Sequence, residues 1–149
     1  IRSLQSETVA QGNPGFTSFI SWPVMLENNA FGKLGLRRNS PGLGAGAVEY
    51  LRHVSVSRIF MNNIDHIQSS WPTMGLEVAQ IALSGGADDI GSTMMEENVV
   101  SASGTTKTMA SVDELERAIL QSGFVPAVRD SEYNILNVLQ QDLTTLKVG

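Results

Sequence analysis

The chain has 149 residues, of which 42% are hydrophobic and 17% charged, and this balance is ordinary for a globular protein with one core. It excludes the disordered and collagen-like classes. The net charge of −5 and the isoelectric point near 4.9 offer no basic surface to a phosphate backbone. The expected partner is therefore a small molecule or a protein rather than a nucleic acid.

The lack of cysteine limits the chemistry further. Without a thiol, these residues form no disulfide, no cysteine nucleophile and no cysteine-ligated zinc or iron–sulfur site. The two histidines, His53 and His66, are too few for a histidine-rich metal site, so no metal ligand is predicted. No apolar run is long enough for a membrane span and no signal peptide is visible, so we expect a cytoplasmic protein. The start at Ile1 hints at a fragment.

The first elements are a helix end, a strand and a loop. Residues 1–7 resemble the tail of a helix, which the glycine- and proline-containing stretch 11–15 ends. Residues 16–22 form an aromatic and β-branched run that stops at Pro23, which is typical of a strand buried in a parallel sheet. The five glycines of residues 28–46 predict a long loop.

Helices and strands then alternate. Apolar spacing predicts a helix within residues 46–63 and another over 75–84, stopped by Gly85-Gly86. Between them, residues 64–71 are expected to form a strand closed by Pro72, and a third short strand is expected at 88–93.

The C-terminal part is predicted to be mostly helical. Ser111 and Glu114 form an S-x-x-E capping box, and Gly123 ends the helix that they begin. A short extended piece is expected at residues 124–128. A last helix is expected at residues 131–142.

This order of elements indicates an α/β fold with right-handed parallel crossovers. Three parallel strands cannot close a barrel and would leave open edges and an exposed apolar layer. Such crossovers occur in doubly wound sheets and in (β/α) barrels, so we expect this chain to be one part of an α/β fold of this kind.

Polar side chains gather where the third strand should end. Because the carboxyl ends of barrel strands form the active site, Ser92, Thr93, Glu96, Glu97 and Asn98 are candidates to bind a polyhydroxylated or cationic ligand. The alternative is that residues 96–98 simply begin a helix, where acidic residues suit the dipole.

A second group of candidates ends the middle strand. An amide, a hydroxyl and an indole at Gln68, Ser70 and Trp71 suit the recognition of a planar base. Alternatively, the polar side chains satisfy neighbouring backbone groups and the tryptophan packs in the core. Trp22, which also precedes a proline, has the same two interpretations.

Two stretches resemble a known family. The sequence Ile67-Gln68-Ser69-Ser70-Trp71 and the stretch at residues 86–100 resemble a radical S-adenosylmethionine family, that of the cyclic dehypoxanthinyl futalosine synthases of menaquinone biosynthesis. The most specific part of the second stretch is its end, G-S-T-M-M-E-E-N-V-V. Residues 16–22 are similar to the F-x-x-F-I-x-W strand of this family, and residues 50–63 and 124–134 continue the resemblance. The glycine-rich loop at 28–46 fits it least.

The resemblance implies a (β/α) radical S-adenosylmethionine barrel. Of this barrel the chain would provide the last three βα units, at about residues 16–110, and the C-terminal helical cap, at about residues 111–149. The full enzyme would use S-adenosylmethionine and a 4Fe–4S cluster whose C-x-x-x-C-x-x-C motif is absent here. By this resemblance Phe19, Ser21 and Trp22 would lie beside the adenosyl group. A futalosine-derived nucleoside would face the candidate substrate residues Gln68, Ser70, Trp71, Ser92, Thr93, Glu96 and Glu97. Individual catalytic residues are not assigned.

Alone, the chain is expected to be inactive and to need its missing N-terminal half or a second copy. Related family members, the deazaflavin-chromophore synthase subunits and aminofutalosine synthase, are the alternative enzymes. A different class of function is a non-catalytic partial barrel that oligomerises through its exposed core and binds a small molecule.

Overall fold

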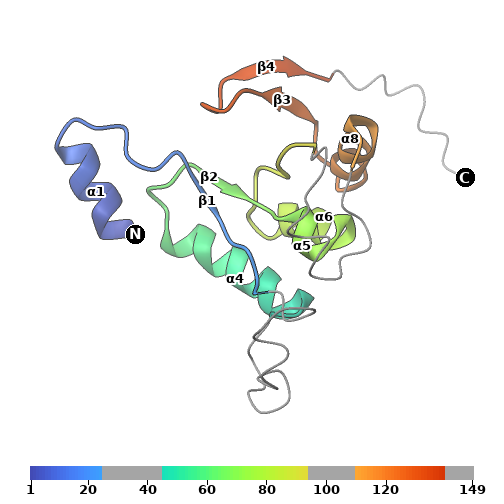
Figure 1. Ribbon diagram of the computed structural model, residues 1–149, viewed down its shortest axis with the longest axis horizontal. Coiled ribbons are helices and arrows are strands. Elements are labelled where there is room, and N and C mark those ends of the chain that lie inside the picture. The colour runs from blue at the N-terminus through green and yellow to red at the C-terminus, as the bar shows by residue number, and fades with distance from the viewer. Residues whose placement is uncertain (25–44, 94–109, 140–149) are drawn as a thin grey trace, which may run out of the picture.

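Parallel strands lie at the centre of the fold. The computed structural model describes residues 1–24, 45–93 and 110–139. Strand β1 (Ser18–Ile20) pairs in parallel with β2 (His66–Gln68), and Gln68 forms a single parallel bridge with Asp89. The three extended segments predicted from the sequence are therefore adjacent and parallel, although the third is reduced to one bridge (Figure 1).

Helices cover one face of these strands. The predicted helices are confirmed as α1 (Arg2–Ala10), α4 (Ala47–Phe60), α6 (Leu76–Ser84) and α8 (Val112–Gln121). The capping box of α8 is present with both hydrogen bonds, between the side chain of each partner and the backbone N–H of the other. It fixes the start of α8 at Ser111.

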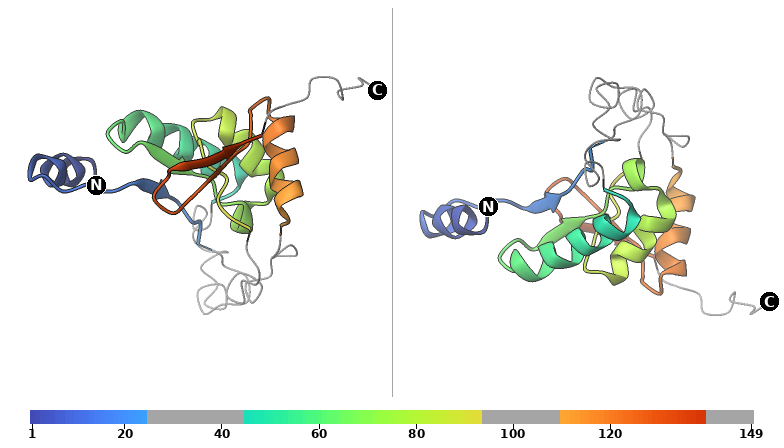
Figure 2. Two further views of the ribbon diagram at one scale, coloured as in Figure 1. Left: turned by 90° about the horizontal axis from the view of Figure 1, so that it is seen from above. Right: turned by 90° about the horizontal axis from the view of Figure 1, so that it is seen from below.

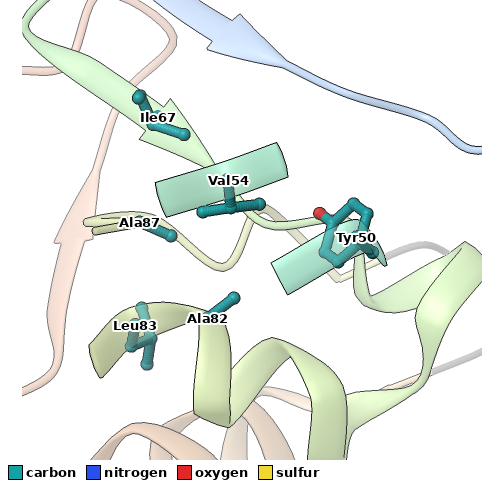
Figure 3. Close-up of a cluster of buried hydrophobic side chains, with 6 residues drawn as sticks. All are labelled: Tyr50, Val54, Ile67, Ala82, Leu83 and Ala87. Carbon is teal, nitrogen blue, oxygen red and sulfur yellow. The ribbon is translucent and has the colours of Figure 1, made fainter. Parts of the chain in front are cut away.

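The core has two parts, which meet at α6. Side chains from α4, β2 and α6 converge in the first part, which Figure 3 shows as Tyr50, Val54, Ile67, Ala82, Leu83 and Ala87. The second part joins α6 to α8 and consists of Trp71, Ala79, Ile90, Ala110, Leu115 and Ala118. The small residues Ala79 and Ala82, both fully buried, let α6 approach both of its neighbours closely.

The predicted strand at residues 64–71 is too long. The ladder stops at Gln68, and Trp71 begins the short helix α5 (Trp71–Met74) instead of ending a strand. Pro72 lies in the first turn of α5. Proline has no backbone N–H, but a residue in the first turn needs none for the helix hydrogen bonds, and the fixed φ of proline suits a helix. The proline therefore marks a helix start here, and not merely the end of a strand.

The predicted last helix at residues 131–142 is wrong over its described part. Strand β3 (Ala127–Arg129) and strand β4 (Ile135–Val138) form an antiparallel hairpin with an irregularity between Val128 and Arg129. The predicted helical cap thus consists, over the described residues, of α8 followed by this hairpin. Seen from above in Figure 2, the hairpin extends from α8 towards β1.

A polar turn explains why this segment is not helical. The Asp130 carboxylate accepts hydrogen bonds from the backbone N–H groups of Glu132 and Asn134 and from the Asn134 side-chain amide, at 2.8–2.9 Å. Tyr133 has a φ of 66°, which a right-handed helix does not allow. The turn therefore reverses the chain before β4.

The structure thus has a mixed α/β fold with a small parallel sheet and an added antiparallel hairpin. A closed barrel is not formed by the described residues. Over these same ranges, no helix combines the length and the apolar character needed to cross a membrane.

We expect Tyr50→Phe to destabilise the fold. The Tyr50 hydroxyl accepts a hydrogen bond of 2.7 Å from the buried backbone N–H of Ser70, which would lose its partner. An unsatisfied buried donor costs about 1–3 kcal/mol of unfolding free energy, which chemical denaturation measures. The control Val56→Ala removes an exposed side chain of the same helix and should change the stability by less than about 0.5 kcal/mol. Equal stabilities of the two variants would contradict the role of this hydrogen bond.

The hairpin turn should weaken in acid. The hydrogen bonds from Asn134, with that from Glu132, hold the pKa of Asp130 below its ordinary value of 3.8. The carboxylate therefore stabilises the turn fully above pH 3.8, and this stabilisation is lost as the pH falls through the lower pKa of the folded state. Amide chemical shifts of Glu132 and Asn134 would follow this loss. Asp130→Asn, which keeps an acceptor oxygen but does not titrate, should abolish the pH dependence.

Candidate functional site

The strand register sorts side chains onto two faces. Ser18 pairs with His66 and Ile20 pairs with Gln68, so these four residues share one face of the sheet. Phe19 and Ile67 share the opposite face and pack on the core beneath α4 and α6. The face with Ser18, Ile20, His66 and Gln68 is called the inner face below.

The hairpin covers the amino-terminal half of the inner face. The Tyr133 ring stacks on His66 with ring centroids 4.0 Å apart, and the Arg129 guanidinium lies over the other side of this tyrosine at 3.9 Å. The two groups on either side of the tyrosine each contact a carboxylate. His66 Nδ1 lies 2.6 Å from Asp88, and Arg129 donates a hydrogen bond to Asp89. The stack therefore fastens the hairpin to the sheet.

Tyr133 is held in a neutral form. Burial raises the pKa of its hydroxyl above the ordinary value of 10.0, and the negative charge of Asp89 raises it further. The hydroxyl oxygen is buried near the side chains of Ser18 and Asp89. The ring forms an aromatic layer between His66 and Arg129.

The carboxyl-terminal half of the inner face is more open. Ile20 is 42% exposed and Gln68 is half-buried. Gly91 follows the bridge at Asp89 with a φ of +87°, and a Cβ built there would lie 2.6 Å from Gln68 Nε2. The glycine therefore lets the Gln68 amide lie directly against the turn that leads to Ser92.

Two other residues predicted at the end of the middle strand are buried. Ser70 is 1% exposed and its hydroxyl accepts a hydrogen bond of 2.8 Å from Thr73, while Trp71 is 2% exposed and donates to the Ser92 carbonyl oxygen at 3.2 Å. Trp71 thereby ties α5 to the end of the third segment. Direct contact of either side chain with a ligand stays a prediction.

The three residues that were predicted to lie beside the adenosyl group have different surroundings. Phe19 packs on the core side, with its ring 6.1 Å from that of His53. Ser21 Oγ lies 2.6 Å from Nε2 of the same histidine. Trp22 is 55% exposed and follows the end of β1, so its indole is the most accessible of the three.

A groove adjoins the third segment. It has a volume of about 550 Å³ and lies between residues 87–93, α8 and the hairpin. Ser92 and Thr93 line it together with apolar side chains such as Leu115, Ile119 and Ile135. Both of these hydroxyl residues are exposed. The predicted Glu96 and Glu97 lie outside the described residues, as do Asn98 and most of the loop predicted at 28–46.

The residues present fit the two implied cofactors differently. The cysteine thiolates that hold a 4Fe–4S cluster are not among these 149 residues, and the described ranges contain no cluster of three metal-ligating side chains. For S-adenosylmethionine, the exposed apolar surface of Ile20 and Trp22 at the end of β1 suits the flat face of an adenine ring.

Sequence reasoning did not single out the residues that fasten the hairpin. Arg129 and Tyr133 were included only in a resembling tail, and Asp89 only in a motif string. The available signal was the charged Arg129 directly after a predicted extended segment, since a charged side chain there needs a buried partner when it points inward. Asp89 is that partner, with a side chain that is 10% exposed.

Comparison with known proteins identifies the family. Residues 13–142 match the family model described as the CofH/MqnC C-terminal region. The chain belongs to this family. The resemblance to the radical S-adenosylmethionine family of the cyclic dehypoxanthinyl futalosine synthases is thereby confirmed.

Two bacterial relatives carry the name cyclic dehypoxanthine futalosine synthase. The protein of Halalkalibacterium halodurans is 39% identical over 140 residues, covering 94% of this chain and 34% of the relative. That of Streptomyces coelicolor is 41% identical over 138 residues, covering 93% and 31%. An archaeal relative from Archaeoglobus fulgidus, named 5-amino-6-(D-ribitylamino)uracil–L-tyrosine 4-hydroxyphenyl transferase, is 36% identical, covering 92% and 37%. The chain thus spans about a third of the length of these relatives.

Gly91→Ala should displace the Gln68 amide. The new methyl group would lie 2.6 Å from Gln68 Nε2, in addition to the strain of a non-glycine residue at φ +87°. The side-chain amide resonances of Gln68 should shift in NMR spectra. Gly123→Ala is the matched control, since Gly123 has a φ of +84° and no atom within 4 Å of its Cβ position. A shift of Gln68 in both variants, or in neither, would contradict the contact.

Proposed function

We propose that this chain is the C-terminal part of a radical S-adenosylmethionine cyclase that acts on dehypoxanthine futalosine in menaquinone biosynthesis. The observation that carries the proposal is the open carboxyl-terminal half of the inner face, where Gln68 lies against Gly91 beside the exposed hydroxyls of Ser92 and Thr93. The ends of parallel strands are where barrel enzymes bind their substrates. The family membership and the names of the two bacterial relatives support this substrate.

In this proposal the chain binds and orients the nucleoside. The Gln68 amide carries both a donor and an acceptor, which suits the edge of a purine-derived or ribose group. Ser92 and Thr93 add hydroxyls of the kind that recognise a sugar. Bound S-adenosylmethionine, with its cluster, would supply the hydrogen abstraction. Ile20 and Trp22 would pack against its adenosyl group at the end of β1, with Phe19 and Ser21 supporting that strand end from the core side.

The remaining barrel strands would come from a preceding part of the protein. β1 and the segment at Asp89 each pair on one side only among the described strands, and parallel sheets are normally covered on both faces. Apolar side chains beside the open edges are exposed, including Ile20 at 42% and Trp22 at 55%. The length of the relatives supports a partner segment about twice as long as this chain. Alternatively, a second copy of the chain would cover these open strand edges.

A second enzymatic function is favoured by the archaeal relatives. Their printed names describe a 4-hydroxyphenyl transferase with a ribitylaminouracil and tyrosine as substrates, and they match as much of this chain as the bacterial relatives do. A planar uracil would meet the same Gln68 amide. The two functions differ in substrate, so turnover of purified full-length protein with each substrate set separates them.

We expect Gln68→Ala in the full-length protein to raise the KM for dehypoxanthine futalosine by about fivefold to tenfold. This corresponds to the loss of one hydrogen bond of about 1 kcal/mol. The value of kcat should change less, because the amide orients the substrate in both the ground state and the transition state. Steady-state kinetics of the protein reconstituted with its cluster measure both quantities.

Gln121→Ala is the matched control. It removes the same side chain from the exposed surface of α8, where Gln121 contacts Gln80. An equal rise of KM in both variants would indicate a general effect on folding. An unchanged KM in Gln68→Ala would contradict the proposed site. Turnover of only the tyrosine and ribitylaminouracil pair would favour the alternative function.

A further inference from the structure

Arg129 extends from the hairpin to the third parallel segment. Its Nε donates to Oδ2 of Asp89 at 2.8 Å, and a second nitrogen of the same guanidinium donates to the same oxygen. The side chains are 24% and 10% exposed, so the pair is partly shielded from water. Such a shielded, charge-assisted pair holds its geometry better than a surface ion pair does.

Asp89 connects its ion pair with Arg129 to the end of the third parallel segment. Its other carboxylate oxygen, Oδ1, accepts a hydrogen bond of 2.7 Å from the backbone N–H of Gly91. Its main-chain carbonyl accepts one of 2.8 Å from Ser69 N. One residue therefore connects the hairpin, the end of β2 and the turn at Gly91.

The turn at Gly91 sets the position of the candidate ligand-binding groups. The Gln68 amide lies against this glycine, and the carbonyl of the next residue, Ser92, accepts the Trp71 indole hydrogen bond. The φ of +87° at Gly91 is one of several that a glycine adopts freely. The hydrogen bond that the Gly91 N–H donates to Asp89 Oδ1 favours this conformation.

We propose that Arg129 is a positioning residue for the ligand-binding end of the sheet. By fixing the rotamer of Asp89, it holds the Gly91 turn, and with it the Gln68 amide, in the orientation that receives the substrate. This inference rests on the proposed function of Gln68. Arg129 lines the groove together with Asp89, Ser92 and Thr93, and its proposed role is to act through Asp89 and not by contact with the substrate.

The chemistry of the pair predicts which substitution is tolerated. Both hydrogen bonds from Arg129 to Asp89 end on one oxygen, so a single ammonium group can replace them in part. Arg129→Lys should therefore retain most of the positioning. Arg129→Met has a similar length but no charge and should lose it.

Hydrogen exchange of the full-length protein tests the first step. We expect the Gly91 amide to lose protection in Arg129→Met and to keep it in Arg129→Lys. Arg117→Met, an exposed arginine of α8, is the matched control and should leave Gly91 protected. If Arg129→Met does not fold, Asp89→Asn replaces it, because it keeps the acceptor for Gly91 but weakens the pair with Arg129. Unchanged protection of Gly91 in the folded variant overturns the proposal.

Kinetics of the same proteins test the second step. We expect kcat/KM for dehypoxanthine futalosine to fall about tenfold or more in Arg129→Met, mainly through KM, with recovery in Arg129→Lys. Loss of Gly91 protection with an unchanged KM overturns the role of Arg129, provided that Gln68→Ala still raises KM. If Gln68→Ala also leaves KM unchanged, the proposed function of this site fails as well.

Discussion

Two adjacent aspartates connect most of the structure. Asp88 accepts hydrogen bonds from the Ile67 backbone and from Arg58 of α4, and it also contacts His66. Asp89, which points the other way, joins β2, the Gly91 turn and the hairpin. A two-residue bridge would be a weak third strand by backbone pairing alone. The carboxylates make it a junction at which a helix, the sheet and the hairpin are fixed relative to each other.

The sequence predicted the helices and the order of the parallel segments well, because each helix carries its own local signal. The capping box at Ser111 and the apolar face of α4 are examples, and both are present in the structure. The hairpin could not be predicted in this way. Its turn depends on one carboxylate, Asp130, and its position depends on partners more than 35 residues away, such as Asp89 for Arg129. A pattern of apolar residues alone does not distinguish such a strand from a helix.

The candidate site was predicted in part for a similar reason. Strand ends can be read from a sequence, so Gln68, Ser92 and Thr93 were predicted near one edge. In the structure Gln68 ends β2 and lies against Gly91, while Ser92 and Thr93 line the groove, and the binding role of all three stays a prediction. Which side of the strand each residue occupies depends on where the strand stops. Since β2 stops at Gln68, Ser70 and Trp71 turn into the helical layer and become buried. Their role as ligand contacts remains a prediction, and so does that of Glu96 and Glu97.

The aromatic stack of His66, Tyr133 and Arg129 gives the inner face two unlike ends. One end is closed by rings and an ion pair, while the other presents an amide and hydroxyls at the strand termini. Asp89, Arg129 and Tyr133 also line the groove that contains Ser92 and Thr93, so a molecule in this groove lies between the stack and these hydroxyls. For protein engineering this separates two tasks. Under the proposed function, substitutions at Gln68 and its neighbours would alter substrate selectivity, and substitutions in the hairpin would alter stability. A change at Asp89 would affect both, because Asp89 bonds the Gly91 turn and the hairpin.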